Sequence, residues 1–384
     1  MIIKVFLIFP HINSYNSNKM KIECIKDKLT WGLDKVAKIA GKNLTLPILS
    51  CVLFEAKKGL LKIKATNLDF GVEVSIPVKV IEEGILAVPG NVAANFIENI
   101  NDRTVLLEEK ENNLTITTER NKTIIKTHNH SDFPNIPNPT KEFSVKINAK
   151  DFINGLASVW YSASTSTIKP ELSSVHIYEQ NDEMIFVATD SFRLAEKKIK
   201  IKKHDSFSPV LIPNKNIQEI IRILGGLEED LEINISKNQL SINVEGLYLV
   251  SRLVDGVFPD YKQIIPKEFK TEITLLKQDL INSLKLAHIF SDNFNQISVH
   301  CLPKKNLFEL KTKNNDVGEN VNQLKAAIKG EDIDINFNYR YLSDAFSSVN
   351  SDSIFIGFNG LSRPVVLNGI ADKSFTYLVM PMNK

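Results

Sequence analysis

The residues of this chain that could do chemistry are mainly acidic. Asp190, Asp255 and Asp260 lie in short polar stretches, and two suitably spaced carboxylates can act as general acid and base. Asp255 and Asp260, however, belong to LVDGVFPDY at 253–261, where Asp-Gly and Pro-Asp are strong turn formers. Asp190 likewise precedes a change of chain direction in VATDSFRLA at 187–195. We therefore interpret all three as turn residues.

Two histidines, His128 and His130, form a His-x-His pattern that could ligate a metal ion. They lie in the polar stretch THNHSDFP with no cysteine nearby, so a surface loop is favoured and we assign no metal. The chain also contains no P-loop, dinucleotide-binding glycine pattern or nucleophile elbow. We therefore expect no catalysis and no cofactor, and keep as an alternative an enzyme whose polar groups converge in a cleft.

The composition is that of a globular protein. Because domains usually span about 100–200 residues, a chain of 384 residues predicts two or three of them. The 43% hydrophobic and 24% charged residues exclude disordered and fibrous classes. A net charge of +2 means that contact with nucleic acid must come from local groups of Lys and Arg. The three cysteines, Cys24, Cys51 and Cys301, favour a reduced cytoplasmic protein over a disulfide framework.

The N-terminus stands apart from the rest of the chain. Its apolar stretch IIKVFLIFP contains Lys4 and stops at Pro10, so it is far shorter than the roughly 20 residues of a membrane helix. It also lacks the small-residue cleavage site of a signal peptide. We expect no membrane association, and we interpret residues 1–19 as a disordered extension or the product of an upstream start codon.

The remainder of the chain repeats itself three times. A strand that runs into a helix, a strand that carries a threonine, and a strand that runs into a second helix recur in this order. Thr66, Thr189 and Thr312 mark the middle element and lie 123 residues apart. A period of that length is too long for a solenoid unit, so we expect each copy to be a domain with its own core. The first element begins at Lys21, Ser144 and Glu272, and the third begins at Leu86, Val210 and Ile335.

The repeat sets the expected fold class and domain boundaries. Each copy offers two helical patterns and many short alternating strands, which predicts an α+β domain with its helices on one face of antiparallel sheets. Prolines among polar residues mark the two junctions. The predicted domains are 20–143, 144–270 and 271–384.

Basic residues recur on the predicted helices, opposite the apolar stripe. In the first helix Leu29, Leu33 and Val36 share one side, and lysines gather on the other. Taken singly, such a row is usually a solvated face, so its meaning depends on how the helices are arranged together. The candidate residues are Lys35, Lys38, Lys42, Lys215, Arg222 and Arg340.

Several segments together resemble one known family. TLPILSCVLFEA at 45–56, VATDSFRLA at 187–195, LVDGVFPDY at 253–261 and the terminal YLVMPMNK at 377–384 are similar to the bacterial DNA polymerase III beta subunits, the replicative sliding clamps. The resemblance runs collinearly from Met20 to Lys384. Ala-Thr-Asp-x-x-Arg-Leu-Ala combined with a Val-Met-Pro-Met ending is highly specific.

This resemblance implies a non-catalytic DNA-binding protein. Two chains would associate head to tail into a six-domain ring around duplex DNA, with sheets outside and helices lining the hole. The basic residues named above would then face phosphates, in contacts that carry no sequence information. Such a ring confers processivity by enclosing DNA. At the subunit boundary the resemblance assigns Ile289 and Phe290 on one side and the strand around Thr123 and Ile125 on the other.

The resemblance also implies a peptide-binding pocket. Short segments of the polymerase III alpha subunit, the clamp loader and other proteins with a clamp-binding motif would enter it. Flexible methionines suit a pocket that must repack around different ligands. Because alternation along a strand buries every second residue, Val379 could instead complete a core strand. The residues carried over are Thr189, Ser191, Phe192, Arg193, Leu194, Pro259, Ile264, Leu361, Arg363, Pro364, Leu378, Val379, Met380, Pro381 and Met382.

The chain departs from the family pattern at two places. Ser191, followed by Phe192, stands where family members commonly carry glycine, and a positive φ there would be costlier for serine. The last two residues, Asn383 and Lys384, also differ from the usual ending. These departures keep open a second interpretation, a clamp paralogue with altered partners.

Overall fold

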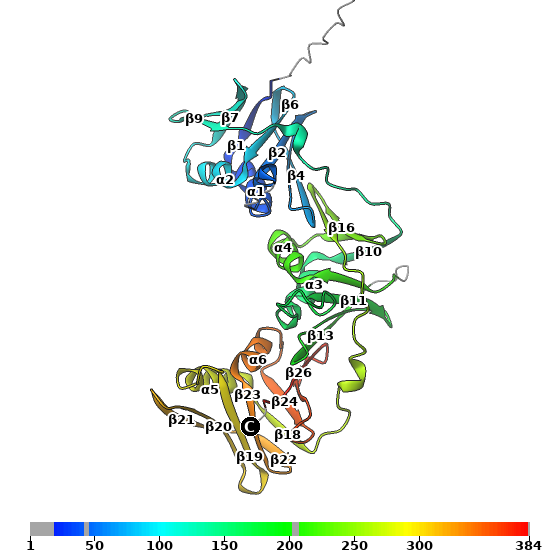
Figure 1. Cartoon of the computed structure of the whole chain (residues 1–384), viewed down its shortest axis with the longest axis vertical. Helices are drawn as coiled ribbons and strands as arrows, with labels where there is room; N and C mark the ends of the chain where they lie inside the picture. Colours follow the sequence, from blue (N-terminus) through cyan, green and yellow to red (C-terminus); the bar gives the residue numbers. More distant parts are fainter. Residues whose placement is uncertain (1–18, 42–45, 202–206, 383–384) are drawn as a thin grey trace, which may run out of the picture. The chain divides into compact units, whose positions relative to one another are not determined.

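A computed structural model describes residues 19–41, 46–201 and 207–382 of the chain. Residues 1–18 of the predicted extension, Lys42, and the terminal pair Asn383 and Lys384 lie outside the described residues. The chain divides into two compact units, of which the first ends at Ile136 and the second begins at Pro137 (Figure 1). In the described ranges no helix has the length and apolar character needed to cross a membrane.

The first unit contains two antiparallel sheets and two helices. The helices α1 (Lys26–Val36) and α2 (Gly90–Asn99) pack against each other, and α1 also covers β3 and β4 (Figure 1). One sheet has the order β5-β1-β7-β8-β9, and the strands of the other lie in the order β6-β2-β3-β4. The strands are β1 (Lys21–Ile25), β2 (Cys51–Lys57), β3 (Leu60–Thr66), β4 (Phe70–Pro77), β5 (Lys79–Glu82), β6 (Gly84–Pro89), β7 (Thr104–Lys110), β8 (Asn113–Thr117) and β9 (Lys122–Lys126).

The second unit begins with a copy of the same arrangement. The helices α3 (Ala149–Ala157) and α4 (Asn214–Leu224) pack together, and α3 covers β12 and β13. One set of strands has the order β10-β15-β16-β17 and the other β14-β11-β12-β13. The strands are β10 (Phe143–Asn148), β11 (Ser174–Gln180), β12 (Glu183–Thr189), β13 (Arg193–Lys200), β14 (Val210–Pro213), β15 (Asp230–Ile235), β16 (Gln239–Val244) and β17 (Leu247–Arg252).

A third copy completes the second unit. The helices α5 (Lys277–Ile289) and α6 (Tyr339–Asp344) contact each other, and α5 also covers β20 and β21. One sheet has the order β21-β20-β19-β23, and a second series has the order β26-β25-β24-β18-β22. The strands are β18 (Thr271–Leu276), β19 (Gln296–Leu302), β20 (Leu307–Asn314), β21 (Gly318–Leu324), β22 (Ala327–Gly330), β23 (Ile333–Asn338), β24 (Ser353–Phe358), β25 (Val365–Gly369) and β26 (Phe375–Val379).

The strand orders confirm the predicted α+β fold and its triplication. The series β1-β7-β8-β9 recurs as β10-β15-β16-β17 and as β18-β24-β25-β26. In the first two copies β2, β3 and β4 begin 123 residues before β11, β12 and β13. The exact domain boundaries at 143 and 270 remain predictions.

A close helix–sheet approach is also repeated. A Cβ atom added to Gly32 in α1 would lie 2.9 Å from Ile63 Cδ1, and one added to Gly155 in α3 would lie 2.4 Å from Phe186 Cε2. Both the glycines and their neighbours are 123 residues apart. Glycine permits this close approach, because a Cβ atom at either point would force the neighbouring side chain to shift.

One strand pairing joins the last two copies and positions the site described below. Residues 193–197 of β13 pair antiparallel with residues 375–379 of β26, so that Leu194 lies opposite Leu378. This produces a continuous sheet in the order β14-β11-β12-β13-β26-β25-β24-β18-β22. Met380, which follows β26, is thereby placed beside the 189–193 turn.

Candidate functional site

The 189–193 turn is built from side-chain to backbone hydrogen bonds. Thr189 Oγ1 donates to the Arg193 carbonyl at 2.7 Å and accepts from the Ser191 amide at 3.2 Å. Asp190 Oδ1 accepts from the amides of Phe192 and Arg193, both at 2.9 Å. Asp190 is therefore a turn residue, as predicted.

Ser191 adopts the left-handed conformation. Its φ is 78°, so the positive φ considered in the sequence analysis is present, and a serine carries it where glycine would be less strained. The turn projects the next side chain, Phe192, which is exposed. The Phe192 carbonyl accepts a hydrogen bond of 2.7 Å from the Met380 amide, which ties the turn to the chain beyond β26.

Arg193 links the turn to the third copy. Its Nε donates to Asp190 Oδ2 at 2.9 Å, and its Nη1 donates to Asp344 Oδ2 in α6 at 2.6 Å. The guanidinium carbon lies 4.6 Å from the ring centroid of Tyr341, in a cation–π contact. Two carboxylates and an aromatic ring therefore hold the Arg193 side chain in one position.

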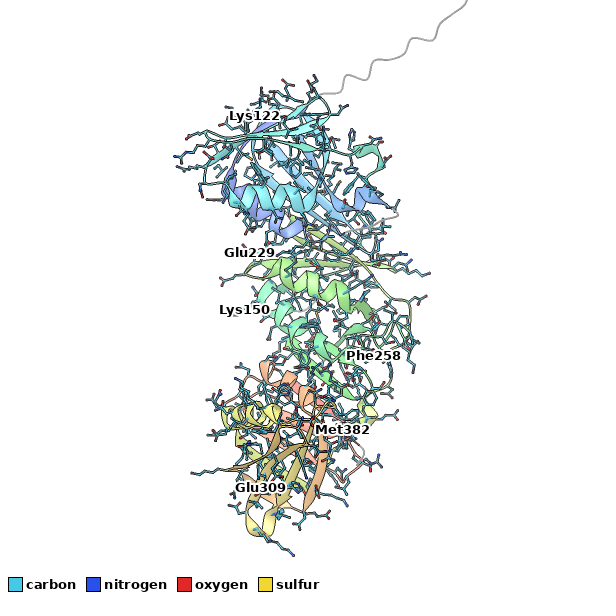
Figure 2. All side chains as sticks on the ribbon, turned by 60° about the vertical axis from the view of Figure 1, so that its left-hand side comes forward. Lys122, Lys150, Glu229, Phe258, Glu309 and Met382 are labelled. Carbon is cyan, nitrogen blue, oxygen red and sulfur yellow. The ribbon has the colours of Figure 1, made fainter. Side chains whose placement is uncertain are left out.

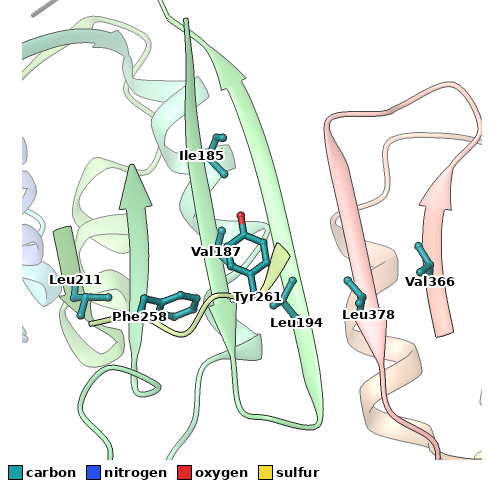
Figure 3. Packing of buried hydrophobic residues seen from close by; sticks show 8 residues of the cluster. All are labelled: Ile185, Val187, Leu194, Leu211, Phe258, Tyr261, Val366 and Leu378. Carbon is teal, nitrogen blue, oxygen red and sulfur yellow. The ribbon is translucent and has the colours of Figure 1, made fainter. Parts of the chain in front are cut away.

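A segment that we call the strap, residues 254–265, crosses the outer face of the β11–β13 sheet. The Val254 amide donates to the Leu211 carbonyl at 2.9 Å at one end of the strap. Further along, Phe258 and Tyr261 are buried in a cluster with Val187, Leu194 and Leu378 (Figure 3). The strap thus covers the apolar face of β12 and β13 and meets β26.

His176 in β11 is held under the strap by two aromatic rings. Its ring centroid lies 4.7 Å from that of Phe258 and 5.1 Å from that of Tyr178, both in stacked geometry. Burial, together with the charge of Lys262, lowers the pKa of His176 to about 4. The imidazole is therefore neutral near pH 7.

The 189–193 turn, the strap and the end of β26 enclose a pocket of about 270 Å³. Many of the predicted residues line it, from the turn and the start of β13, the strap, the end of β26 and the residue before β25: Thr189, Ser191, Phe192, Arg193, Leu194, Pro259, Ile264, Pro364, Leu378 and Met380.

Other predicted residues do not line the pocket. Val379 is fully buried, because strand alternation turns it to the face opposite Leu378, so its assignment to the pocket is wrong. The Met382 amide bonds to the Asn336 carbonyl instead, at 2.8 Å. Outside the lining lie Leu361, Arg363, Val379, Pro381 and Met382.

The pocket also contains residues that the sequence analysis missed. Asp260 and Tyr261 directly follow Pro259, so the turn motif itself could have indicated them. Lys169, Glu171 and Leu172 come from the loop before β11, and no motif in that loop pointed to the pocket. Only the folded arrangement brings this loop to the turn.

The predicted basic residues fall into different environments. Lys38, Lys215 and Arg340 are exposed, although Lys38 pairs with Asp34 at 3.1 Å. Arg222 is half-buried and pairs with Glu219 at 2.8 Å. An exposed lysine that the sequence analysis did not select, Lys150, lies at the beginning of α3 (Figure 2).

Lys35 departs from the prediction. Its side chain is buried, with only 7% of the residue exposed, so the prediction that it faces outward is wrong. A helical wheel gives directions around one helix only, and it omits the segments that pack over that helix. The aliphatic stem of a lysine can contribute to such packing.

Two sheet edges carry exposed apolar residues. β9 ends the first sheet of the first unit, and β21 ends a sheet of the third copy. Ile289 is 65% exposed at the end of α5, and Phe290 beside it is half-buried. In β9 Ile125 is buried and its neighbour Ile124 is 61% exposed, and the assignment of Ile125 to the subunit boundary stays a prediction. A shift of one residue reverses the face of a strand.

Comparisons with known proteins cover nearly the whole chain. Models of the N-terminal, central and C-terminal domains of the DNA polymerase III beta subunit match residues 20–137, 146–260 and 262–383. The beta sliding clamp of Synechococcus elongatus is 28% identical over 94% of this chain and 99% of its own. That of Staphylococcus epidermidis is 25% identical over 91% and 96%.

Solved structures show the same fold. The DNA polymerase III beta subunit of Thermotoga maritima is 25% identical, with a TM-score of 0.90 over 95% of this chain and all of its own. A sliding clamp from Pseudomonas aeruginosa, solved with bound griselimycin, is 20% identical, with a TM-score of 0.89 over 95% and 100%.

Proposed function

This chain belongs to the DNA polymerase III beta subunit family, and we propose that it encircles duplex DNA as half of a homodimeric ring and tethers partner proteins through the pocket. It is a sliding clamp, a non-catalytic processivity factor. We also infer a cytoplasmic location, since the three cysteines are free and buried, as is usual in a reducing compartment.

The ring requires two chains to associate head to tail. The edge strands β9 and β21 support this association because a paired edge removes unsatisfied backbone groups. Ile124 in β9, and Ile289 at the end of helix α5 that packs on β21, add exposed apolar surface. Light scattering is expected to give about twice the chain mass of 43.3 kDa. Ile289→Glu is expected to reduce that mass to one chain. A wild-type monomer at micromolar concentration would contradict the ring.

Basic residues on the helices supply the contact with DNA. Lys38, Lys150, Lys215 and Arg340 are exposed on four different helices or their ends, which suits phosphate contacts without base reading. Binding to linear duplex is therefore expected to be weak, independent of sequence and strongly weakened by salt. Retention on a closed circular DNA is expected to persist because enclosure does not depend on affinity.

The pocket carries the proposal for partner binding. Its apolar residues Leu194, Ile264, Leu378 and Met380 suit the hydrophobic side chains that dominate peptide affinity. Phe192 is exposed at the same site and offers further apolar surface. The partners that we propose are the polymerase III alpha subunit, the clamp loader and other proteins with a clamp-binding motif.

Two methionines allow a matched test of the pocket. Met380 lines the pocket and Met382 does not. A fluorescent peptide copying the C-terminal tail of the polymerase alpha subunit from the same genome is expected to bind, and Met380→Ala to weaken it about tenfold. Met382→Ala is expected to bind as the wild type does. A chain that remains on circular DNA but does not bind this peptide would favour the paralogue interpretation.

A further inference from the structure

A buried carboxylate lies behind the pocket. Glu196 in β13 is 5% exposed and accepts a short hydrogen bond from the Tyr261 hydroxyl of the strap. The Tyr178 hydroxyl lies 2.7 Å from that of Tyr261. Lys198 Nζ is 3.4 Å from Glu196 Oε1 and is the cation of this group. The four side chains connect two strands of the sheet to the strap.

The direction of the hydrogen bonds in this group is determined. Burial, reinforced by the neighbouring charge of Glu196, raises the pKa of Tyr261. The Tyr261 hydroxyl therefore stays protonated and donates a hydrogen bond to the carboxylate. The Tyr261 oxygen is then left to accept from Tyr178. The Tyr261 hydroxyl therefore acts as both a hydrogen-bond donor and an acceptor, and these two bonds orient its ring.

The position of Glu196 is unusual for a charged residue. It lies on the same face of β13 as Leu194, because the two are two positions apart in the strand, and that face packs in the apolar cluster under the strap (Figure 3). A carboxylate taken out of water needs strong partners to offset its desolvation. A hydrogen bond to a charged group is about twice as strong as a neutral one, so the contact with Tyr261 is a strong and buried polar attachment of the strap.

The same strap forms one wall of the pocket. Pro259, Asp260, Tyr261 and Ile264 all belong to it and line the pocket, whereas Glu196 does not. Other polar attachments lie nearer the surface, such as Lys262 Nζ to Gln180 Oε1 at 2.6 Å. The position of the wall therefore depends on a carboxylate that lies outside the pocket lining.

We propose that Glu196 is a positioning residue of the pocket, which sets ligand affinity by holding Tyr261 and the strap against the sheet. The inference rests on the proposed function of the pocket. A wall fixed before binding avoids the ordering cost that a loose strap would add to association. Loosening the strap therefore weakens binding without removing a ligand contact.

Two conservative variants test this inference. Tyr261→Phe keeps the ring in the pocket and removes the hydroxyl, and Glu196→Gln removes the charge. Each is expected to weaken both griselimycin and the fluorescent polymerase tail peptide about tenfold. Because both changes break one contact, the double variant is expected to bind no more than about twofold more weakly than either single variant.

Matched controls separate positioning from general stability. Tyr248→Phe removes a hydroxyl that bonds the Pro137 carbonyl at 2.7 Å, and Glu232→Gln removes a carboxylate that pairs with Lys141. Both residues lie outside the pocket lining, so both variants are expected to bind as the wild type does. If Glu196→Gln does not fold, Tyr178→Phe breaks only the outer bond, and its expected loss is about threefold.

The outcomes distinguish the inference from the function on which it rests. A wild-type chain that binds neither probe overturns both. Wild-type binding that Met380→Ala weakens, while Glu196→Gln, Tyr261→Phe and Tyr178→Phe leave it unchanged, overturns the positioning role alone. Fully additive losses in the double variant would also overturn it, because the two side chains would then act separately.

Discussion

The sheets β2–β4 and β11–β13 share one architecture, but the outer face is charged in the first and mostly apolar in the second. In the first unit that face is charged: Lys62 Nζ pairs with Glu73 at 2.6 Å, and Lys64 Nζ pairs with Glu55 at 2.7 Å. These side chains alternate with buried apolar residues such as Ile63, so the sheet is polar outside and apolar inside. Salt bridges between partly exposed groups keep this face soluble and add little stability.

The corresponding positions in the second unit, 123 residues later, are mostly apolar. Tyr178 stands in place of Glu55, Ile185 in place of Lys62, and Val187 in place of Lys64, whereas Glu196 keeps the carboxylate of Glu73. An apolar outer face must be covered, and the strap covers it. The retained carboxylate of Glu196 keeps one lysine partner, Lys198 at 3.4 Å, and gains the hydroxyl of Tyr261.

The difference teaches where a binding site arises in a repeated fold. Both copies have the turn that follows the threonine: Thr66 Oγ1 donates to the Phe70 carbonyl at 2.9 Å, as Thr189 Oγ1 does to that of Arg193. Both turns also hold a residue with positive φ at the same place, Leu68 at 76° and Ser191 at 78°. The turn is therefore scaffold, and the pocket depends on the apolar face, the strap and β26 beside it.

The largest expected effect concerns the phenylalanine of each Phe-Pro segment. Phe258 in the strap is buried, and Phe133 in the first unit is only half-buried against the cluster of Ile48, Leu49, Cys51 and Ala87. Phe258→Ala is expected to lower the free energy of unfolding by about 4 kcal/mol, and Phe133→Ala by about half as much. Urea denaturation measures both. Equal losses would contradict a special role for the strap.

A pH dependence from the position of His176 is expected in the second unit only. Leu53 stands 123 residues before His176 and cannot titrate. The pKa of His176 is about 4 in the folded chain and about 6.5 when unfolded, so the unfolded chain binds the proton more readily. The contribution of neutral His176 to the free energy of unfolding is fully present above pH 6.5, and it falls by roughly 3 kcal/mol as the pH drops to 4.

The variant His176→Leu isolates this contribution. The pH dependence of its unfolding free energy, compared with that of the wild type between pH 7 and 4, is expected to lack this loss. His130→Gln, which changes an exposed histidine, serves as the control and is expected to keep it. A wild-type curve that matches that of His176→Leu would show that the stacked imidazole does not resist protonation.

The two corresponding carboxylates are expected to differ in their contribution to stability. Glu73→Gln weakens partly exposed ion pairs and is expected to cost no more than about 0.5 kcal/mol. Glu196→Gln weakens a buried charged hydrogen bond and is expected to cost about 2 kcal/mol. Urea denaturation of both variants sharpens the comparison, and a larger cost for Glu73→Gln would reverse it.

The smallest expected effect concerns the two left-handed residues. Ser191→Gly relieves the cost of a positive φ but increases the freedom of the unfolded chain, so a net gain of about 0.5 kcal/mol is expected. Leu68→Gly is expected to give a similar gain. Thermal unfolding measures both, and a gain in only one of them would show that the two turns are not energetically equivalent.

Local features of the site were predictable. The repeat, the α+β class and the turn at Asp190 depend on contacts within a few residues or on periodic patterns, and each is present in the structure. The match of Thr312 was less informative. Thr312 lies inside β20 opposite Asn320, in a hairpin that continues to Asn314. The similar local sequence therefore does not form the same turn there.

Predictions that depended on orientation or on distant segments were less successful. Val379 was placed on the wrong face of its strand, and Lys35 was placed on the exposed side of its helix. The loop at 169–172 was missed altogether. No local pattern states which other segment will cover a given face.

The sequence by itself determined the number of copies, the class of each copy and the family, because these follow from periodicity and from motifs that keep their order. Only the tertiary structure decided that the strap, the 189–193 turn and Met380 enclose one pocket, and that Glu196 lies behind it. The physical reason is that hydrogen bonding and alternation act along a strand or turn, whereas a pocket requires the packing of segments far apart in the chain.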